Sequence, residues 1–339
     1  MNSILTYNDI NPTQWQHLVE ESRTGTWFQS PAAYRLYASL PEVMQPFVVA
    51  IATDGMLRGV CVGYVTRDSN PLRQFFTRRA IIVGGPCLAD DCTNNEAEHL
   101  LRAVIQSPEN ANLGNQKPKT ESPIYIETRN FNDYSLWREA FQAAGFTYRP
   151  HLNFHVDTQG FADRLSDNRK RQLKKSAASV LRAQSEDEVR AWYPVLARLY
   201  RTKVRMPLFP VEFFLQAFRQ GAATFLLVRY DNRIIGGNMI VEDPKCVYEW
   251  FECGLNTQYR EQYPSVLATF AGMEYAAKQG CERYDLMGAG EPGVPYGVRD
   301  FKSEFGGRLV EHGRFLAVRH PLLYRIGLTA VRFLKRKAQ

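Results

Sequence analysis

Apolar and polar positions alternate along the first half of the chain in a way that predicts short strands and amphipathic helices. We expect strands at 47–52, 59–65, 80–83 and 124–127, and helices at 12–21, from 31, at 95–106 and at 134–144. Asp54-Gly55 separates the first two strands by a two-residue turn, which predicts a β-hairpin. Residues 107–122 are polar and rich in Pro and Asn, so they are expected to form a surface loop.

The second half repeats this order. Apolar runs predict strands at 225–228 and 234–241 around a turn at Asp231-Asn232, then a helix at 264–278 and a strand around Leu286. A hairpin, a helix and a strand in the same order twice indicate a duplicated α/β module, with domains at 1–150 and 151–339. Between the two halves we expect a helical segment at 164–183, and a helix opened by a capping box at 185–188.

Residues 281–307 combine an apolar strand, a loop rich in Gly and Pro, and an ordered segment that ends at Gly306-Gly307. Gly288, Gly290 and Gly293 have the spacing of a dinucleotide-binding fingerprint, but the prolines that follow do not allow a helix to start inside it, so we reject a Rossmann fold. Lys302 lies between Phe301 and Phe305, which predicts an ammonium group held in place.

This stretch carries a family resemblance. Its order of strand, Y-D-x-x-G, loop and F-K-x-x-F-G-G resembles the FemABX aminoacyltransferases, through Tyr284, Asp285, Gly288, Phe301, Lys302, Phe305, Gly306 and Gly307. The match continues in a Y-R-x-x-Y-P-x-x-L pattern at 259–267 and a basic helix at 168–176. The resemblance implies an α/β fold of two tandem GNAT-like (acyl-CoA N-acyltransferase) domains, with mixed sheets and helices on both faces.

The resemblance also implies a function, and two alternative functions are considered beside it. An aminoacyl group would move from aminoacyl-tRNA to an amine of a peptidoglycan precursor, in cell wall biogenesis. The first alternative is an acyl-CoA-dependent N-acyltransferase acting on a cell-envelope sugar or lipid. The second is a non-enzymatic, membrane-peripheral binding protein. In the enzymatic hypotheses the aminoacyl-tRNA or the acyl-CoA is a co-substrate, and no cofactor is tightly bound.

The resemblance points to Lys302 as the catalytic residue, because the family's lysine lies at the transfer site, where a fixed ammonium would stabilise an oxyanion. Phosphate contacts are expected from Arg205, and from Lys170 and Lys174 on one helical face; the alternatives are a helix-end charge and a solvated face. The other substrate-binding candidates are Phe301, Tyr248, Tyr259 and Arg260. Carboxylates are plentiful here, Glu252 and Asp285 among them, but their spacing does not name a general base.

Composition adds limits on partners and compartment. The net charge of +7 and the pI near 9.0 favour either an anionic partner or a generally basic surface. The six cysteines lack metal-site spacing, which predicts reduced, buried thiols, a cytoplasmic protein and no metal. We see no signal peptide and no apolar run long enough to span a bilayer. Residues 320–339 interleave apolar and basic residues, which predicts either a basic interfacial helix with peripheral contact at the inner face of the cytoplasmic membrane, or a helix packed on the second domain.

Overall fold

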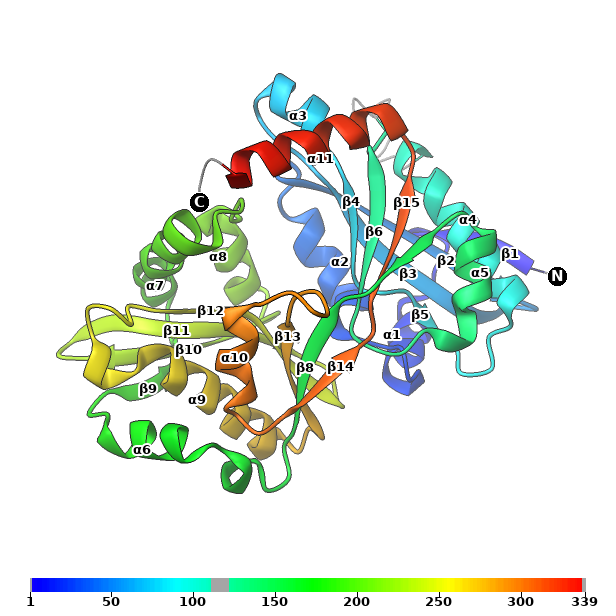
Figure 1. Cartoon of the computed structure of the whole chain (residues 1–339). Helices are drawn as coiled ribbons and strands as arrows, with labels where there is room; N and C mark the ends of the chain where they lie inside the picture. The colour runs from blue at the N-terminus through cyan, green and yellow to red at the C-terminus, as the bar shows by residue number, and fades with distance from the viewer. Residues whose placement is uncertain (1, 111–121, 337–339) are drawn as a thin grey trace. The chain divides into compact units, whose positions relative to one another are not determined.

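The structure is a computed structural model that describes residues 2–110 and 122–336 (Figure 1). The chain forms two compact units, Met1–Pro150 with His312–Gln339, and His151–Glu311. The sequence predicted domains at 1–150 and 151–339; in the structure the second unit ends at 311, and residues 312–339 belong with the first unit. The physical reason is strand pairing, because β15 (Arg314–Val318) pairs with two strands of the first unit.

The first unit is built on one mixed sheet with the order β1-β2-β3-β4-β6-β15-β7, and β5 lies beside β3. Only the β4–β6 pair is parallel among the strands described. The strands are β1 Asn2–Thr6, β2 Met44–Thr53, β3 Met56–Thr66, β4 Ala80–Gly84, β5 Cys87–Leu88, β6 Tyr125–Asn130 and β7 Thr147–Arg149. The helices are α1 Pro12–Glu21, η1 Trp27–Gln29, α2 Pro31–Ala38, α3 Pro71–Thr77, α4 Asn94–Asn110, η2 Ser135–Trp137, α5 Arg138–Ala143 and α11 Pro321–Arg336.

Strand β2 shows how this sheet is covered on both faces. It is buried at every position from Met44 to Ala52, so both sets of alternating side chains are shielded from water. Phe47, Val49 and Ile51 join the core cluster that α4 completes, and α2 also packs on β2. The expected layers of a GNAT-like unit are therefore present.

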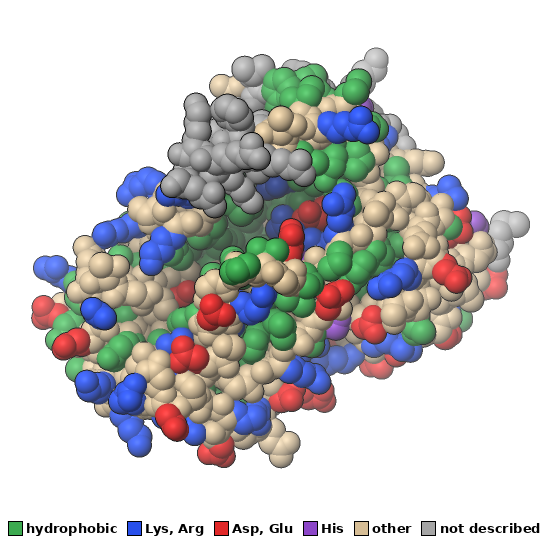
Figure 2. Space-filling model, in the orientation of Figure 1, with side chains coloured by type: hydrophobic (Ala, Val, Ile, Leu, Met, Phe, Trp, Pro, Cys, Tyr) green, Lys and Arg blue, Asp and Glu red, His purple; other side chains and the backbone are tan. Residues whose placement is uncertain are grey.

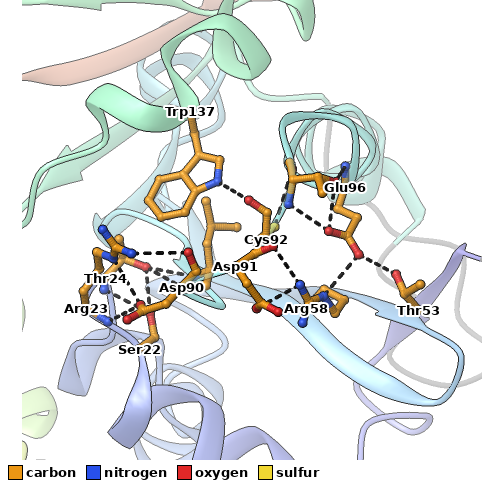
Figure 3. A network of polar contacts seen from close by, with 12 residues as sticks. Ser22, Arg23, Thr24, Thr53, Arg58, Asp90, Asp91, Cys92, Glu96 and Trp137 are labelled. Atoms are coloured by element: carbon orange, nitrogen blue, oxygen red, sulfur yellow. Dashed lines mark hydrogen bonds and ion pairs between the residues drawn. The ribbon is translucent and has the colours of Figure 1, made fainter.

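A polar network ties the start of α4 to the sheet (Figure 3). The carboxylate of Glu96 accepts hydrogen bonds from the Thr93 N–H at 2.8 Å and the Thr53 hydroxyl at 2.7 Å, and pairs with the Arg58 guanidinium at 3.1 Å. Burial alone would raise the pKa of Glu96, but these partners together lower it to about 2. The Thr93 and Glu96 side chains form a capping box, so one carboxylate both starts the helix and attaches it to β2 and β3.

The second unit has a mixed sheet of the order β14-β8-β13-β12-β11-β10-β9, in which the β12–β13 pair is parallel. Its strands are β8 Leu152–Asp157, β9 Ser179–Arg182, β10 Thr224–Tyr230, β11 Arg233–Glu242, β12 Cys246–Gly254, β13 Arg283–Gly288 and β14 Arg308–Glu311. Its helices are η3 Phe161–Arg164, α6 Asp167–Lys175, α7 Glu186–Leu199, η4 Tyr200–Val204, α8 Val211–Arg219, η5 Arg260–Gln262, α9 Pro264–Gln279 and α10 Gly297–Ser303.

Both expected hairpins form with the expected turns. Asp54 and Gly55 have φ values of 50° and 81°, and Asp231 and Asn232 have φ values of 49° and 58°. Positive φ at both central residues matches the right-handed twist of the flanking strands, which is why Asp, Asn and Gly occupy these positions.

Two predicted elements differ from the structure. The helix expected over 164–183 ends at Lys175, and Ser179–Arg182 is instead strand β9, paired with β10 at the sheet edge. The loop expected to continue through Gly297 gives way there to α10. An edge strand depends on a partner far away in sequence, so local pattern alone does not reveal it. The loop predicted over 107–122 lies mostly outside the described residues, and α4 extends to Asn110.

All six cysteines are buried free thiols, as expected. No helix in the described part of the chain is both long and apolar enough to cross a membrane.

Candidate active site

The two parallel strands of the second unit stop pairing halfway along. β12 and β13 pair from Cys246↔Arg283 to Tyr248↔Asp285, although β12 continues to Gly254. In the first unit the corresponding parallel strands, β4 and β6, pair at all five residues of β4. The two parallel strands therefore separate in the second unit, whereas they stay paired in the first.

A β-bulge in β12 places two carboxyl groups on one face of the sheet. Glu249 pairs with Ile240, and Phe251 pairs with Met239, so Trp250 is an extra residue. Glu249 and Glu252 are three residues apart and would face opposite sides of a regular strand. Their cross-strand partners, Ile240 and Asn238, are two apart, so the bulge brings both glutamates to the same face.

Glu249 is the fully enclosed member of this pair. Its carboxyl group accepts hydrogen bonds from the Tyr284 hydroxyl at 2.6 Å, the Thr269 hydroxyl at 3.3 Å and the Asn238 amide at 3.4 Å. Burial raises its pKa above the usual range, against these hydrogen bonds and the Lys302 charge. Helix α9 supplies Thr269, and Gly272 on the same helix allows the approach, since a Cβ there would lie 2.0 Å from the Tyr284 hydroxyl.

Glu252 is the less enclosed carboxyl of the pair. Burial, and then the like charge of Glu249, raise its pKa to about 8, while Ser265 and the Lys302 ammonium act in the opposite direction. Its Oε1 atom is buried and has no hydrogen-bond partner in the part of the chain that the structure describes. A carboxyl group that titrates near neutral pH is suited to accept a proton from an amine.

Lys302 lies beside both glutamates, on α10. Its side chain is 8% exposed, and its Nζ donates to the carbonyl oxygens of Leu286 at 2.5 Å and Gly288 at 2.7 Å. Both carbonyls belong to β13 beyond the point where its pairing with β12 stops. The ammonium is therefore hydrogen-bonded to the part of β13 that β12 leaves unpaired. Burial lowers the pKa of Lys302, whereas the charges of Glu249, Asp285 and Glu252 favour the ammonium.

The two aromatic side chains expected to frame Lys302 frame Arg169 instead. The Arg169 guanidinium lies 4.5 Å from the Phe301 ring and 5.0 Å from the Phe305 ring. Positions 301 and 305 are one helical turn apart and share a face, while position 302 points elsewhere. Phe301 therefore contacts a buried arginine of α6, and the sequence-based interpretation of its role was wrong in this respect.

A buried contact between a histidine and a carboxylate lies next to the site. His155 Nε2 and Asp285 Oδ2 are 3.2 Å apart on neighbouring strands. Burial acts to raise the pKa of Asp285, but His155 and Arg283 more than offset it and lower the value. Asp285 therefore contributes negative charge near Lys302, and its position explains the acidic residue of the Y-D-x-x-G motif.

The glycines that close the motif have a structural reason. Gly306 has a φ of 75°, and a Cβ there would lie 2.2 Å from the Arg164 carbonyl oxygen. The turn from α10 into β14 therefore requires glycine.

Tyr248 is not available to a substrate, so that prediction was wrong. Its side chain is fully buried, and its hydroxyl donates to Asp243 Oδ2 at 2.8 Å. On the regular part of β12, alternation turns position 248 away from the face that carries Glu249.

The remaining predicted binding residues differ in their exposure. Tyr259 packs against Tyr230, and Arg260 is exposed on η5. Arg205 is exposed at the end of η4, and Lys203 of η4 acts electrostatically on Glu252.

The two lysines predicted to bind phosphate lie on α6. Lys174 is exposed, whereas Lys170 donates to the Asp163 carbonyl oxygen at 2.8 Å. Their helix joins the site through Arg169, which packs on Phe301.

Comparison with known proteins agrees with the fold. Residues 161–303 match the family model described as an acetyltransferase (GNAT) domain. A search of curated protein sequences finds no match. Among solved structures, FemX is similar over 96% of this chain and 99% of its own, with a TM-score of 0.68 and 13% identity.

Two further structures are similar at lower scores. A tandem GNAT protein from the clavulanic acid biosynthesis pathway has a TM-score of 0.56 and 10% identity, over 94% of this chain and 98% of its own. The C-terminal domain of a putative lysylphosphatidylglycerol synthetase from Agrobacterium fabrum has a TM-score of 0.55 and 11% identity, over 91% of each chain.

The fold and the family match define the class. The chain has a FemX-like tandem GNAT fold, and its second unit is an acyltransferase domain of the GNAT type.

Proposed function

We propose that the protein transfers an aminoacyl group from aminoacyl-tRNA to an amine of a peptidoglycan precursor, with the chemistry carried by Glu252 and Lys302. The observation that carries the proposal is the electrostatic interaction of a carboxyl group of raised pKa with a fixed ammonium where β12 and β13 separate. The FemX-like fold of the whole chain supports the same class of reaction.

In the proposed reaction, the Glu252 carboxylate accepts a proton from the neutral attacking amine. The amine nitrogen forms an amide bond with the aminoacyl carbon, the ester bond to the tRNA ribose breaks, and the departing ribose oxygen takes the proton from Glu252 and becomes a hydroxyl. Lys302 has three N–H donors, and β13 carbonyls accept two of them. The third is assigned to the carbonyl oxygen on which negative charge develops.

The start of α9 favours tRNA over acyl-CoA as the donor. Free N–H groups at a helix N-terminus that follows a strand commonly bind a pyrophosphate. Here Pro264 has no N–H, and the Ser265 N–H donates to Asn256 Oδ1 at 3.2 Å. The Val266 and Leu267 N–H groups both donate to the Tyr263 carbonyl oxygen, at 2.9 and 3.1 Å. The helix start is therefore closed to the diphosphate of coenzyme A.

Basic side chains near the site fit the phosphates of a tRNA acceptor arm. Lys174, Arg205 and Arg260 are exposed on three different elements of the second unit, and Lys170 is half-buried beside Lys174. We assign them to backbone phosphates, whose contacts need charge rather than sequence readout.

Acyl-CoA-dependent transfer to an envelope sugar or lipid is the second candidate, supported by the similarity to a tandem GNAT protein. Cytoplasmic location with peripheral contact at the membrane belongs to the same proposal. A non-enzymatic binding protein is the third reading, and the buried carboxyl group of raised pKa beside a buried lysine argues against it.

Mass spectrometry of the purified protein incubated with charged tRNA, or separately with an acyl-CoA pool, tests the donor. We expect loss of the aminoacyl ester in the presence of amine acceptors and no release of free CoA. Release of CoA with intact aminoacyl-tRNA would assign the acyl-CoA reaction, and turnover of neither donor would leave the binding role. The Glu252→Gln variant is the matched control, because it keeps the side-chain shape and removes the base.

A further inference from the structure

The positive charge of this protein is concentrated in one segment. The chain has 42 Lys and Arg against 35 Asp and Glu, a net charge of +7. Residues 312–339 contain seven Lys and Arg and no Asp or Glu, so the rest of the chain is formally neutral. Most of this segment is α11, which begins at Pro321.

One face of α11 packs on its own unit. The Arg319 and His320 N–H groups donate to the Ile124 carbonyl oxygen at 2.9 and 3.1 Å, which attaches the start of the helix to the sheet. The Tyr324 ring lies 5.4 Å from the Tyr125 ring of β6. Position 324 therefore marks the inner face of the helix.

The other face presents apolar and basic side chains to solvent. Leu322 and Ile326, one helical turn apart, are 76% and 53% exposed, and Arg325 between them is exposed. In sequence, Arg332 and Phe333 follow Arg325 and Ile326 at an interval of seven, so the pattern continues.

Helix α3 contacts α11 and extends this surface (Figure 1). Phe75 and Phe76 of α3 are 37% and 41% exposed. Large exposed apolar side chains grouped on adjacent helices mark an interaction site. Hydrophobic side chains are visible at the top edge of Figure 2, the edge where Figure 1 shows α3 and α11.

We propose that the outer face of α11, with Phe75 and Phe76 of α3, docks the protein on an anionic lipid surface. The apolar side chains would enter the boundary between headgroups and acyl chains, and the basic residues would contact the headgroups. Residues 312–339 carry basic and no acidic side chains, which complements the charge of an anionic surface. In a symmetric dimer the same face would meet its own copy, so the basic residues of the two copies would repel each other. This inference is independent of the donor.

Vesicle co-sedimentation of the full chain tests it, with phosphatidylglycerol-containing vesicles and phosphatidylcholine vesicles as the two arms. We expect salt-sensitive binding to the anionic vesicles and no binding to the neutral ones. Leu322→Glu with Ile326→Glu should weaken binding at least about tenfold, and Arg325→Glu with Arg332→Glu should do the same, since each basic residue near an anionic surface adds severalfold.

Matched changes elsewhere provide the controls. Met56→Glu with Leu136→Glu alters two equally exposed apolar residues, and Arg233→Glu with Lys278→Glu alters two exposed basic ones. These variants should bind vesicles as the parent does, and thermal unfolding should show all four variants folded. Equal binding to neutral vesicles, no binding by the parent, or equal losses in the controls would overturn the proposal. Dimers that dissociate in the Leu322→Glu, Ile326→Glu variant without any vesicle binding would assign the face to a second copy of the chain.

Discussion

At the scale of single residues, the chemistry of the site depends on a few side chains whose charges are set by burial. Glu252 is the clearest case, because burial and Glu249 together raise its pKa to about 8. If Glu252 is the general base, kcat/KM should rise with pH and level off above about 8, where the carboxylate predominates. Glu252→Gln should remove this rise and lower activity by about 100-fold or more.

A pH–rate profile from pH 6 to 9.5 measures both effects. Glu261→Gln is the control, because it changes an exposed carboxyl group between β12 and α9. The assignment fails if the Glu252→Gln variant retains the rise with pH.

The same pKa predicts a stability effect that needs no substrate. The unfolded chain releases the Glu252 proton near pH 4.5, and the folded chain holds it to about pH 8. Deprotonation therefore opposes folding, and the parent loses stability as pH rises through this interval. Glu252→Gln should have a higher Tm than the parent at pH 9 and an equal Tm at pH 4, measured by thermal unfolding. Equal Tm values at both pH values would contradict the raised pKa.

Lys302 has a structural role as well as a proposed catalytic one. Lys302→Met leaves the Leu286 and Gly288 carbonyls without their donor, and each unpaired buried polar group costs about 1–3 kcal/mol. We expect a fall in unfolding free energy together with a rate loss of about 100- to 1000-fold per folded molecule. Donor-consumption assays and denaturant unfolding measure the two effects, with Lys278→Met, an exposed lysine, as control. Near-parental turnover would remove Lys302 from the mechanism.

At the scale of elements, the site depends on how closely α9 packs on β13. Gly272→Ala would place a methyl group 2.0 Å from the Tyr284 hydroxyl, so the helix or the tyrosine must move. We expect a loss of about 1–3 kcal/mol in unfolding free energy and reduced activity, because the hydrogen bond from Tyr284 to Glu249 is disturbed.

Gly327 of α11 gives the matched control for this change. It is also a helical glycine, but a Cβ there meets open space. Gly327→Ala should stabilise the protein slightly, by about 0.5–1 kcal/mol. Equal effects of the two alanines in denaturant unfolding would show that helix propensity, and not the contact with Tyr284, decides the outcome.

At the scale of the whole molecule, the first unit is assembled from two separate parts of the chain, and the second unit from one continuous part. β15 lies between β6 and β7 in the first sheet, although it follows the whole second unit in sequence. Residues 1–150 alone therefore lack an internal strand and should not fold. Residues 151–311 carry every strand of the second sheet and should fold alone.

Circular dichroism and hydrogen exchange on these fragments test the difference. A chain ending at Arg319 keeps β15 and should retain protection in β6 and β7, whereas a chain ending at Glu311 should lose it. A stable, protected 1–150 fragment would contradict this arrangement.

Local features of the fold could be predicted from sequence because their causes are local. The hairpin turns at 54–55 and 231–232 follow from residues that tolerate positive φ. The repeat of hairpin, helix and strand follows from hydrophobic periodicity, and the tandem GNAT-like fold was implied by the resemblance of the motifs to the FemABX family. Lys302 could also be chosen as a candidate from sequence, since its motif lies in one continuous stretch, and its catalytic role stays a prediction.

Tertiary structure decided what depends on distant partners. The bulge at Trp250 is defined by its pairing with β11. Without it Glu249 and Glu252 would face opposite sides, so the sequence did not single out Glu252 as the proposed base. The rings of Phe301 and Phe305 contact Arg169 of α6, and not Lys302, because residues 301 and 305 share one helical face and that face packs on α6. β15 joined the first sheet because a strand pairs with whichever edge or gap can satisfy its backbone, at any separation along the chain.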